Sequence, residues 1–371
     1  MRRTGFIRTI TFAVFLLTTV VAGAEVRLAS WNIQHLGWDN DKSYEAVARV
    51  SARFDVVAIQ ELMNADALER LVDALERKTG EDWESLNSAP LGESSYREKY
   101  AFIWRDEAVE YTGGATTYID ERDRFAREPF AAPFRAKDSD WTFVAATVHI
   151  VYGDTLSDRT PEIRALRHYW DWLAEVYPDD ADSRILFGDF NLRPGHDAWE
   201  SMWEVAEPLV TDGATTLSTN DREFANIYDN ILVPLDHDLP ITAAGVEDFP
   251  ALLTETTPHY WSHEKARAHV SDHAPVYAIL GDTELHPPRT GELRVPNRVS
   301  ADGEPPPEPE CVDINEASVE DLERLPHVGP ARAEDIIDGR PWASVAGLRE
   351  VGGIGGGRLE EIVDSGVVCE E

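Results

Sequence analysis

The chain of 371 residues is poor in cysteine, in lysine and in long apolar runs, and each scarcity excludes something. Its two cysteines allow one internal disulfide at most. Beyond residue 24 its apolar runs are too short to cross a bilayer, which takes about 20 apolar residues. Its 34 basic residues, of which five are lysines, stand against 69 acidic ones. This balance excludes broad electrostatic attraction to nucleic acid, so any contact with DNA must be local or mediated by cations.

The acidic excess gives the chain a formal net charge of −35. Such a charge keeps a protein soluble but loads its folded state with self-repulsion. Concentrated salt screens that repulsion. We therefore expect a halophilic protein, one that works in high salt.

The N-terminus has the form of a targeting segment. Three arginines precede an apolar run over residues 10–21, and Ala22-Gly23-Ala24 follows with the small-x-small form of a cleavage site. The run contains no cysteine that could carry a lipid anchor. We expect residues 1–24 to be a signal peptide and the protein to be secreted or periplasmic. An uncleaved signal anchor is the alternative.

Predicted strands and helices alternate over residues 25–283. Apolar runs predict strands over 26–31, 55–59, 100–104, 109–111, 141–150, 185–187, 227–233 and 276–280. Helical periodicity predicts helices over 44–53, 65–78 and 161–177. This alternation indicates a layered α/β domain with functional residues along one shared rim.

Polar residues stand at the ends of these strands. The strand over 185–187 runs into Gly188-Asp189-Phe190-Asn191. On an extended chain Asp189 and Asn191 would share one face, where they suit a hard cation or orient a phosphate and a water. An ordinary Asp/Asn turn is the alternative. Eight such residues lie at or beside strands: Asn32, Glu61, His149, Asp189, Asn191, Asp229, Asp272 and His273. Together they predict one site.

The last part of the chain changes character twice. Residues 284–310 contain seven prolines and little apolar periodicity, which predicts an extended linker. Residues 311–371 contain two similar units that predict helix, glycine turn and helix. Cys311 and Cys369 bracket this small domain, and export permits a disulfide between them.

Each glycine turn precedes a helix whose free N–H groups and dipole can hold a phosphate. The turns need few basic side chains for this purpose. A helical hairpin that only packs is the alternative. The candidate DNA-contacting residues are His327, Val328 and Gly329 in the first turn and Gly353, Ile354 and Gly355 in the second.

Several motifs resemble known families. Ser30-Trp31-Asn32-Ile33-Gln34, Ile59-Gln60-Glu61, Thr147-Val148-His149, Gly188 to Asn191, Tyr228-Asp229-Asn230 and Ser271 to Pro275 resemble the endonuclease/exonuclease/phosphatase superfamily, and within it the DNase I-like nucleases. The resemblance implies a four-layer αββα sandwich of α/β (α+β) class and hydrolysis of phosphoesters. The last 60 or so residues resemble the tandem helix-hairpin-helix module of competence DNA receptors, which implies a small all-α DNA-binding domain.

Two further segments resemble DNase I itself. The run from Pro90 to Tyr100 is similar to the segment that carries a minor-groove tyrosine and a catalytic glutamate, which implies these roles for Tyr96 and Glu98. Arg127-Glu128-Pro129 is similar to its phosphate-contacting arginine site. Met63 departs from the pattern, because the mammalian enzyme has a groove-inserting arginine there. The two disulfides of that enzyme have no counterparts here.

The resemblance also implies which residues transfer the protons. In-line attack on a phosphodiester needs a base for the water and an acid for the leaving oxygen, and two histidines can divide these roles. By resemblance, His273 paired with Asp229 is the base, and His149 paired with Glu98 is the acid.

The implied metal site uses oxygen ligands. Glu61 is the expected ligand with Asn32, and Asp272 supports the metal side. Asp189 and Asn191 orient phosphate and water or hold a second ion. Oxygen ligands predict Mg²⁺, or Ca²⁺ or Mn²⁺, rather than zinc.

We therefore expect an exported, metal-dependent deoxyribonuclease that acts without sequence specificity on double-stranded DNA. We expect a monomer that does not dock on membranes, with its helix-hairpin-helix tail holding DNA. One alternative is a phosphatase or phospholipase of the same fold, of the inositol phosphatase or sphingomyelinase type. The other is a non-enzymatic DNA-capture protein for uptake.

Overall fold

The computed structural model falls into two compact units, Met1–Pro296 and Asn297–Glu371. In the first unit it describes residues 24–290 except 39, 93–95, 140, 154, 220–223 and 259. In the second unit it describes 312–315, 317, 322, 325, 327–342, 344–355, 358–359, 362 and 368. Among these residues, no helix combines the length and the apolar character that a membrane span requires.

One mixed sheet holds six strands in the order β12-β13-β1-β2-β4-β3. Their bounds are β1 Val26–Leu36, β2 Val56–Leu62, β3 Trp83–Asn87, β4 Lys99–Arg105, β12 Ile241–Val246 and β13 Val276–Leu280. β1 and β2 run parallel, so the two strands end at the same edge of the sheet. The edge strands β3 and β12 have no sequence prediction, because most of their residues are partly exposed and form no apolar run.

The second sheet has the order β10-β11-β9-β8-β7-β5, with β6 also paired to β7. Their bounds are β5 Val109–Tyr111, β6 Thr116–Thr117, β7 Phe130–Ala136, β8 Thr142–His149, β9 Arg184–Asp189, β10 Ala206–Pro208 and β11 Asp229–Pro234. β8 and β9 run parallel. β7 has no sequence prediction, because a proline inside a run of residues disfavours a strand. This residue is Pro133, which lies next to Phe134, the partner of Tyr111 of β5.

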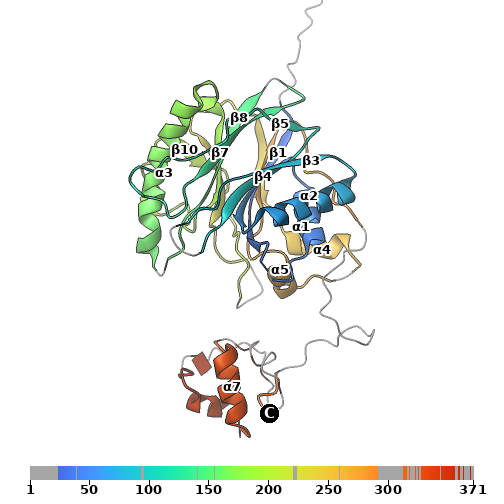
Figure 1. The fold of residues 1–371 in the computed structure, drawn as a ribbon, viewed down its shortest axis with the longest axis vertical. Coiled ribbons are helices and arrows are strands. Elements are labelled where there is room, and N and C mark those ends of the chain that lie inside the picture. Colours follow the sequence, from blue (N-terminus) through green and yellow to red (C-terminus); the bar gives the residue numbers. More distant parts are fainter. Residues whose placement is uncertain are drawn as a thin grey trace, which may run out of the picture. The chain divides into compact units, whose positions relative to one another are not determined.

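Helices cover the outer face of each sheet (Figure 1). The first sheet packs under α1 Tyr44–Ser51, α2 Ala65–Thr79, α4 Phe249–Thr256 and α5 His263–His269. The second packs under α3 Leu156–Val176. A separate apolar core, with Phe102, Phe134 and Phe187 among its members, fills the space between the sheets. The predicted αββα sandwich is confirmed.

Capping residues set the helix ends. Ser43 accepts a hydrogen bond from Ala46 N at the start of α1, and Asn64 accepts one from Ala67 N at the start of α2. The predicted start of the third helix at residue 161 is wrong. α3 begins at Leu156, because Thr155 and Asp158 form a capping box ahead of Pro161.

The N-terminal ends of β1 and β2 carry a cluster that we call the Asp55 cluster. It is made of Asp55, Arg27, Arg105 and His286. The Asp55 carboxylate lies 3.0 Å from Arg27 Nη1, 3.3 Å from Arg105 Nε and 2.6 Å from His286 Nε2. Arg289 then reaches Glu81 at 3.1 Å. Contacts with the first unit thus continue past residue 283, where the sequence predicts the linker to begin.

The second unit is helical, with α7 Pro330–Asp338 and a 3₁₀ turn over Val345–Glu350. Further 3₁₀ turns in the first unit span Pro178–Ser183 and Asp197–Trp199. Leu322, Ile336 and Leu348 are buried in the core of the second unit. Val312 and Val368 form a parallel β-bridge between its two ends. The predicted Cys311–Cys369 disulfide and most of the predicted linker lie outside the described residues.

Candidate active site

Strand ends from both sheets meet at one edge, which we call the rim. It carries Asn32 and Glu61 from the parallel strands β1 and β2. His149 ends β8, and in the sheet register it pairs with Asp189 at the end of β9, which pairs in turn with Asp229. Glu98 precedes β4 and His273 precedes β13. Residues that are far apart in the sequence therefore converge, as the strand-end pattern predicts.

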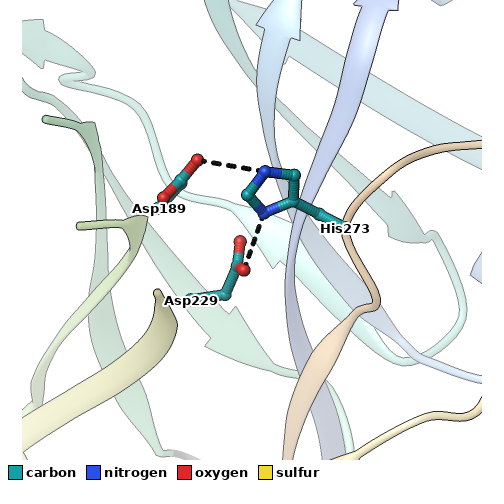
Figure 2. Close-up of side chains that lie close together, drawn as sticks. All are labelled: Asp189, Asp229 and His273. Carbon is teal, nitrogen blue, oxygen red and sulfur yellow. Dashed lines mark hydrogen bonds and ion pairs between the residues drawn. The ribbon is translucent and has the colours of Figure 1, made fainter. Parts of the chain in front are cut away.

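The first histidine–carboxylate pair is His273 with Asp229. His273 Nδ1 lies 2.8 Å from Asp229 Oδ2, and His273 Nε2 lies 3.6 Å from Asp189 Oδ2 (Figure 2). Thr215 Oγ1 also donates to Asp229 Oδ2 at 2.6 Å. These contacts fix the imidazole with Nε2 directed toward Asp189.

Burial and the neighbouring charges shift the pKa values of both residues of this pair. Burial raises the pKa of Asp229 to about 6, although the neighbouring His273 opposes the shift. Burial alone would lower the pKa of His273, but the carboxylates of Asp229 and Asp189 outweigh it and raise the pKa well above its usual value. Asp229 Oδ1 is buried without a hydrogen-bond partner among the described residues. The contacts within the pair therefore leave part of the negative charge of the Asp229 carboxylate uncompensated.

The second pair is His149 with Glu98. His149 Nδ1 lies 2.7 Å from Glu98 Oε1, and Arg127 Nε lies 3.3 Å from the same oxygen. Burial would raise the pKa of Glu98, but His149 and Arg127 outweigh it and bring the pKa to about 2. Burial would lower the pKa of His149, and the charge of Glu98 overcomes it and raises the pKa. Glu98 is thus held as a carboxylate and His149 as a proton donor.

Asp189 stands between the two pairs. Its Oδ2 lies 3.5 Å from His149 Nε2 and 3.6 Å from His273 Nε2, and it accepts a hydrogen bond from Asn32 Nδ2 at 3.0 Å. The free ring nitrogens of both histidines therefore face one carboxylate oxygen. A phosphodiester bound at this point would have His149 within reach as a proton donor, and His273 as a proton acceptor once a cation offsets the carboxylate charge that raises the pKa of His273.

Oxygen atoms suited to a divalent cation lie beside Asp189. Asn32 Nδ2 donates to Glu61 Oε1 at 3.0 Å as well as to Asp189, so one amide is all that separates two converging carboxylates. The Glu61 backbone is left-handed, with φ 60°. Such strain is found at functional sites, where it holds a side chain in place. The carboxylates of Glu61 and Asp189 therefore fit a hard cation such as Mg²⁺, whereas Asn32 presents Nδ2 to them and its Oδ1 accepts a hydrogen bond from Gln34 N at 2.9 Å.

A second group of possible ligands overlaps the first. Atoms of Asp189, Asp229 and His273 lie within 4.8 Å of one another. His273 already uses Nδ1 on Asp229, so the oxygen set around Glu61 suits Mg²⁺ better. Asp272, predicted to support the metal, accepts hydrogen bonds from Arg267 Nη2 at 3.1 Å and Gln34 Nε2 at 2.8 Å.

Asn191 lies at the rim in a different way from the expected one. β9 ends at Asp189, and Asn191 adopts a left-handed φ of 50°, so the extended spacing does not reach it. Its Nδ2 donates to Ile150 O at 2.8 Å, and its carbonyl accepts from Arg159 at 2.6 Å. Its side chain thereby ties the loop after β9 to the end of β8.

The two predicted DNA contacts of the first unit both support Glu98. Arg127 is partly buried, and its Nη2 donates to His149 O at 2.9 Å in addition to its contact with Glu98. Tyr96 donates from its hydroxyl to Glu98 Oε2 at 3.1 Å. Both side chains therefore hold the His149 pair in position.

Three residues of the site had no sequence prediction. Thr215 bonds Asp229 from a loop that no motif marks. The Tyr100 hydroxyl accepts a hydrogen bond from His149 N at 2.9 Å and lies in a strand predicted only as core. His35 N donates to Glu61 Oε2 at 2.9 Å. Two of the three carried a signal, because His35 directly follows the Ser30 to Gln34 motif and Tyr100 ends the run from Pro90 that resembles DNase I.

The glycine turns of the second unit lie side by side. Arg332 donates to His327 O of the first turn at 2.6 Å and to Gly352 O of the second at 3.4 Å. The left-handed residue of the first turn is His327, with φ 63°, whereas Gly329 is extended at the start of α7. In the second turn Gly353 has φ 85°. Val328 and Ile354 are buried, so these two contribute backbone rather than side chains to the surface.

Comparison with known proteins agrees with this geometry. Residues 29–273 match the endonuclease/exonuclease/phosphatase family, and residues 309–365 match the helix-hairpin-helix motif. A deoxyribonuclease of Thioalkalivibrio sp. (strain K90mix) is 58% identical over 97% of each chain. Human deoxyribonuclease-1 is 27% identical over 72% of this chain and 97% of its own. The chain belongs to the endonuclease/exonuclease/phosphatase family, in its DNase I-like form, and carries a helix-hairpin-helix motif after that domain.

Proposed function

We propose that this enzyme is a metal-dependent deoxyribonuclease that hydrolyses phosphodiester bonds without sequence preference. The observation that carries the proposal is the arrangement of two histidine–carboxylate pairs around Asp189, whose Oδ2 lies 3.5 and 3.6 Å from the two Nε2 atoms. The relative that is 58% identical is a deoxyribonuclease and matches 97% of this chain. The match includes the helix-hairpin-helix tail, which supports DNA as the molecule that both units of this chain bind.

The two histidines divide the proton transfers. His273 Nε2 accepts a proton from the attacking water as its oxygen bonds to phosphorus. The bond from phosphorus to the leaving oxygen then breaks, and His149 Nε2 gives that oxygen its proton. Asp229 and Glu98 hold the Nδ1 atoms at 2.8 and 2.7 Å, which fixes both rings for these transfers.

The carboxylates of the rim define the cofactor. Glu61 and Asp189 would hold Mg²⁺, with Ca²⁺ or Mn²⁺ as substitutes, because their donor atoms are oxygens, and Asn32 would join them if its amide turned Oδ1 toward the cation. When bound, the cation offsets the carboxylate charge and stabilises negative charge on the phosphate oxygens. Asp189 then orients the phosphate between the two imidazoles.

The second unit supplies affinity for long DNA. Its first turn offers backbone N–H groups around Pro330, which begins α7 and has none itself, and Arg332 holds the two turns together. A tethered DNA binder raises the local substrate concentration for an acidic catalytic unit that binds weakly by itself. Export, predicted from residues 1–24, gives such an enzyme access to free DNA. The net charge of −35 supports activity in concentrated salt.

A supercoiled plasmid tests the proposal. Purified protein with Mg²⁺ should first produce nicked circles, and EDTA should abolish cleavage. Titration from low to molar salt should raise activity if the acidic surface is adapted to salt. RNA, inositol phosphates and sphingomyelin, assayed in parallel, separate this activity from others of the same fold. Intact plasmid together with hydrolysis of one of the last two would overturn the proposal.

A further inference from the structure

The last residues of β1 and the turn after it hold an exposed tryptophan, Trp38, beside the rim. The backbone of this segment is strained, with left-handed φ values of 53° at His35 and 107° at Gly37. Trp38 N donates to His35 O at 3.0 Å, and Asn64 Nδ2 donates to Gly37 O at 2.7 Å. A Cβ at Gly37 would lie 2.6 Å from Asn64 Nδ2, so the close turn requires glycine. The chain therefore fixes this turn firmly.

Three rings form what we call the aromatic cluster, namely Trp38, His35 and Tyr96. The indole of Trp38 stacks on His35 with centroids 4.0 Å apart and planes 10° apart. Tyr96 meets both rings edge-on, at 5.9 Å from Trp38 and 6.1 Å from His35. These rings cover one face and one edge of the indole, yet 49% of Trp38 is exposed. A rigid aromatic surface thus remains open to solvent.

The aromatic cluster is attached directly to the candidate active site. His35 N donates to Glu61 Oε2 at 2.9 Å, and the Tyr96 hydroxyl donates to Glu98 Oε2 at 3.1 Å. Glu61 and Glu98 serve the predicted metal site and the His149 pair. The exposed indole is therefore linked to the site through one residue on each side: it stacks on His35, which bonds Glu61, and it contacts Tyr96, which bonds Glu98.

Charge is a poor source of affinity at this rim. Arg127 is committed to Glu98 and His149 O, and Arg267 is committed to Asp272. The whole chain carries a net charge of −35, and any Coulomb attraction to phosphate weakens further in salt. Stacking of a base on an aromatic ring does not need a positive charge, and every base has a face that can stack.

We propose that the open face of Trp38 receives a nucleobase from the nucleotide next to the cleaved phosphodiester. This inference rests on the proposed function, because it assumes that the rim cleaves DNA. In a duplex both faces of each base are covered by its neighbours. A stacking surface beside the site therefore favours strands whose bases are unpaired or displaced, and it gives the enzyme a preference for single-stranded and frayed DNA.

Base-free DNA provides the test. Single-stranded oligonucleotides of equal length are prepared with normal bases or with tetrahydrofuran residues that keep the sugar-phosphate chain. The full-length wild-type protein with Mg²⁺ should cleave the normal strand with a kcat/KM roughly 5- to 150-fold higher, the worth of one stacked base. Trp38→Ala should lose that advantage on the normal strand and cleave the base-free strand like the wild type. Trp38→Phe should keep most of it.

Val176→Ala is the matched control for loss of an exposed apolar side chain. Val176 ends α3, and Arg159, which bonds Asn191 O, lies near its start, so Val176 is about 25 Å from the rim along the helix. It should match the wild type on both strands. Melting curves check that all variants fold. The melting temperature of Trp38→Ala should stay close to that of the wild type, because about half of Trp38 is already exposed.

The outcomes separate this inference from the proposed function. Equal loss on both strands in Trp38→Ala would overturn stacking, and so would wild-type cleavage that ignores the bases. A larger loss on blunt duplex than on single strands would show a groove wedge instead and overturn the base-stacking assignment. If the wild type cuts no DNA at all, the proposed function fails and takes this inference with it.

Discussion

The two ends of the parallel strands β1 and β2 carry charged clusters of opposite balance. At one end the Asp55 carboxylate is surrounded by Arg27, Arg105 and His286 within 3.3 Å. At the other end Glu61 and Asp189 converge on a single amide of Asn32. The same pair of strands thus ends once in a charge-compensated cluster and once in an excess of carboxylates.

The pKa directions record this difference. At the Asp55 cluster burial would raise the pKa of Asp55, but His286 and Arg27 outweigh it, so the pKa is lowered. At the rim burial raises the pKa of Asp229 to about 6. The Asp55 cluster therefore stabilises the fold as it stands, and so does the compensated Glu98 with its pKa of about 2, whereas the Asp229 side of the rim gains stability only when protons or cations arrive. Unbalanced charge of this kind is typical of functional sites.

The largest expected effect comes from the rim histidines. His149→Ala and His273→Ala should each lower kcat on plasmid DNA by about 10²- to 10⁴-fold, because each removes an acid or a base. His286→Ala, at the Asp55 cluster, is the control and should leave kcat unchanged. Near-normal turnover in both rim variants would contradict the assigned roles, and a large loss in His286→Ala would break the distinction between the two ends.

Removing the charge of Asp55 should cost stability rather than activity. Asp55→Asn removes one carboxylate partner of the buried guanidinium of Arg105, which keeps its ion pair with Glu81, so the cost in the free energy of unfolding should reach at most the about 3–5 kcal/mol of a fully broken buried pair. Urea denaturation at constant salt measures the change. Asp189→Asn at the rim should have the opposite character, losing activity while its free energy of unfolding is equal to or above that of the wild type. A comparable loss of stability in both variants would contradict the distinction between the Asp55 cluster and the rim.

The Asp55 effect should depend on pH. Because the folded pKa of Asp55 is lowered from 3.8, its contribution is fully present above that value and is lost as the pH falls through the folded pKa. The free energies of unfolding of wild type and Asp55→Asn should therefore converge in strong acid. A gap that stays constant from neutral pH into strong acid would mean that the carboxylate charge is not the cause.

Glu61 should set the demand for metal. Glu61→Gln should raise the Mg²⁺ concentration for half-maximal cleavage by at least about 10-fold, because a carboxylate of the oxygen set is lost. Titration of Mg²⁺ in the plasmid assay measures this shift. Glu84→Gln removes an exposed carboxylate from the edge strand β3 and serves as the matched control. An unchanged Mg²⁺ requirement in Glu61→Gln would move the cation to the Asp189, Asp229 and His273 group.

Truncation should give the smallest effects and separates the tail from the Asp55 cluster. Deleting residues 291–371 should raise KM on long DNA more than it lowers kcat, because a tether acts through local concentration. Deleting residues 284–371 also removes His286 from Asp55, so it should in addition lower the melting temperature. Equal KM with and without the tail would remove its proposed role, and equal melting temperatures would remove that of His286.

The sequence predicted the rim better than the sheet edges. The rim residues follow apolar runs, so Asn32, Glu61, His149 and Asp189 could be placed on one edge before any coordinates. β3 and β12 are half exposed and give no such run. Thr215 bonds Asp229 through a tertiary contact that no local pattern encodes.

Asn191 shows a second limit, at the level of single dihedral angles. Its left-handed φ of 50° depends on the hydrogen bonds that its amide and carbonyl make to other loops. The aromatic cluster shows a third, because Trp38 follows a glycine turn and has no apolar periodicity to mark it. Residues whose position is set by tertiary contacts were therefore missed or misplaced.

The start of β1 and the end of β13 lie together at the end that carries the Asp55 cluster. Gly281 packs so closely there that a Cβ on it would lie 2.5 Å from Ala24 O. From that end the chain continues over α1 and α2, where Arg289 pairs with Glu81 and lies with Thr290 beside Glu45. These residues belong to the packed surface of the first unit. For protein engineering, an exchange of the tail for another binding module should therefore be made after residue 290 and not at residue 283.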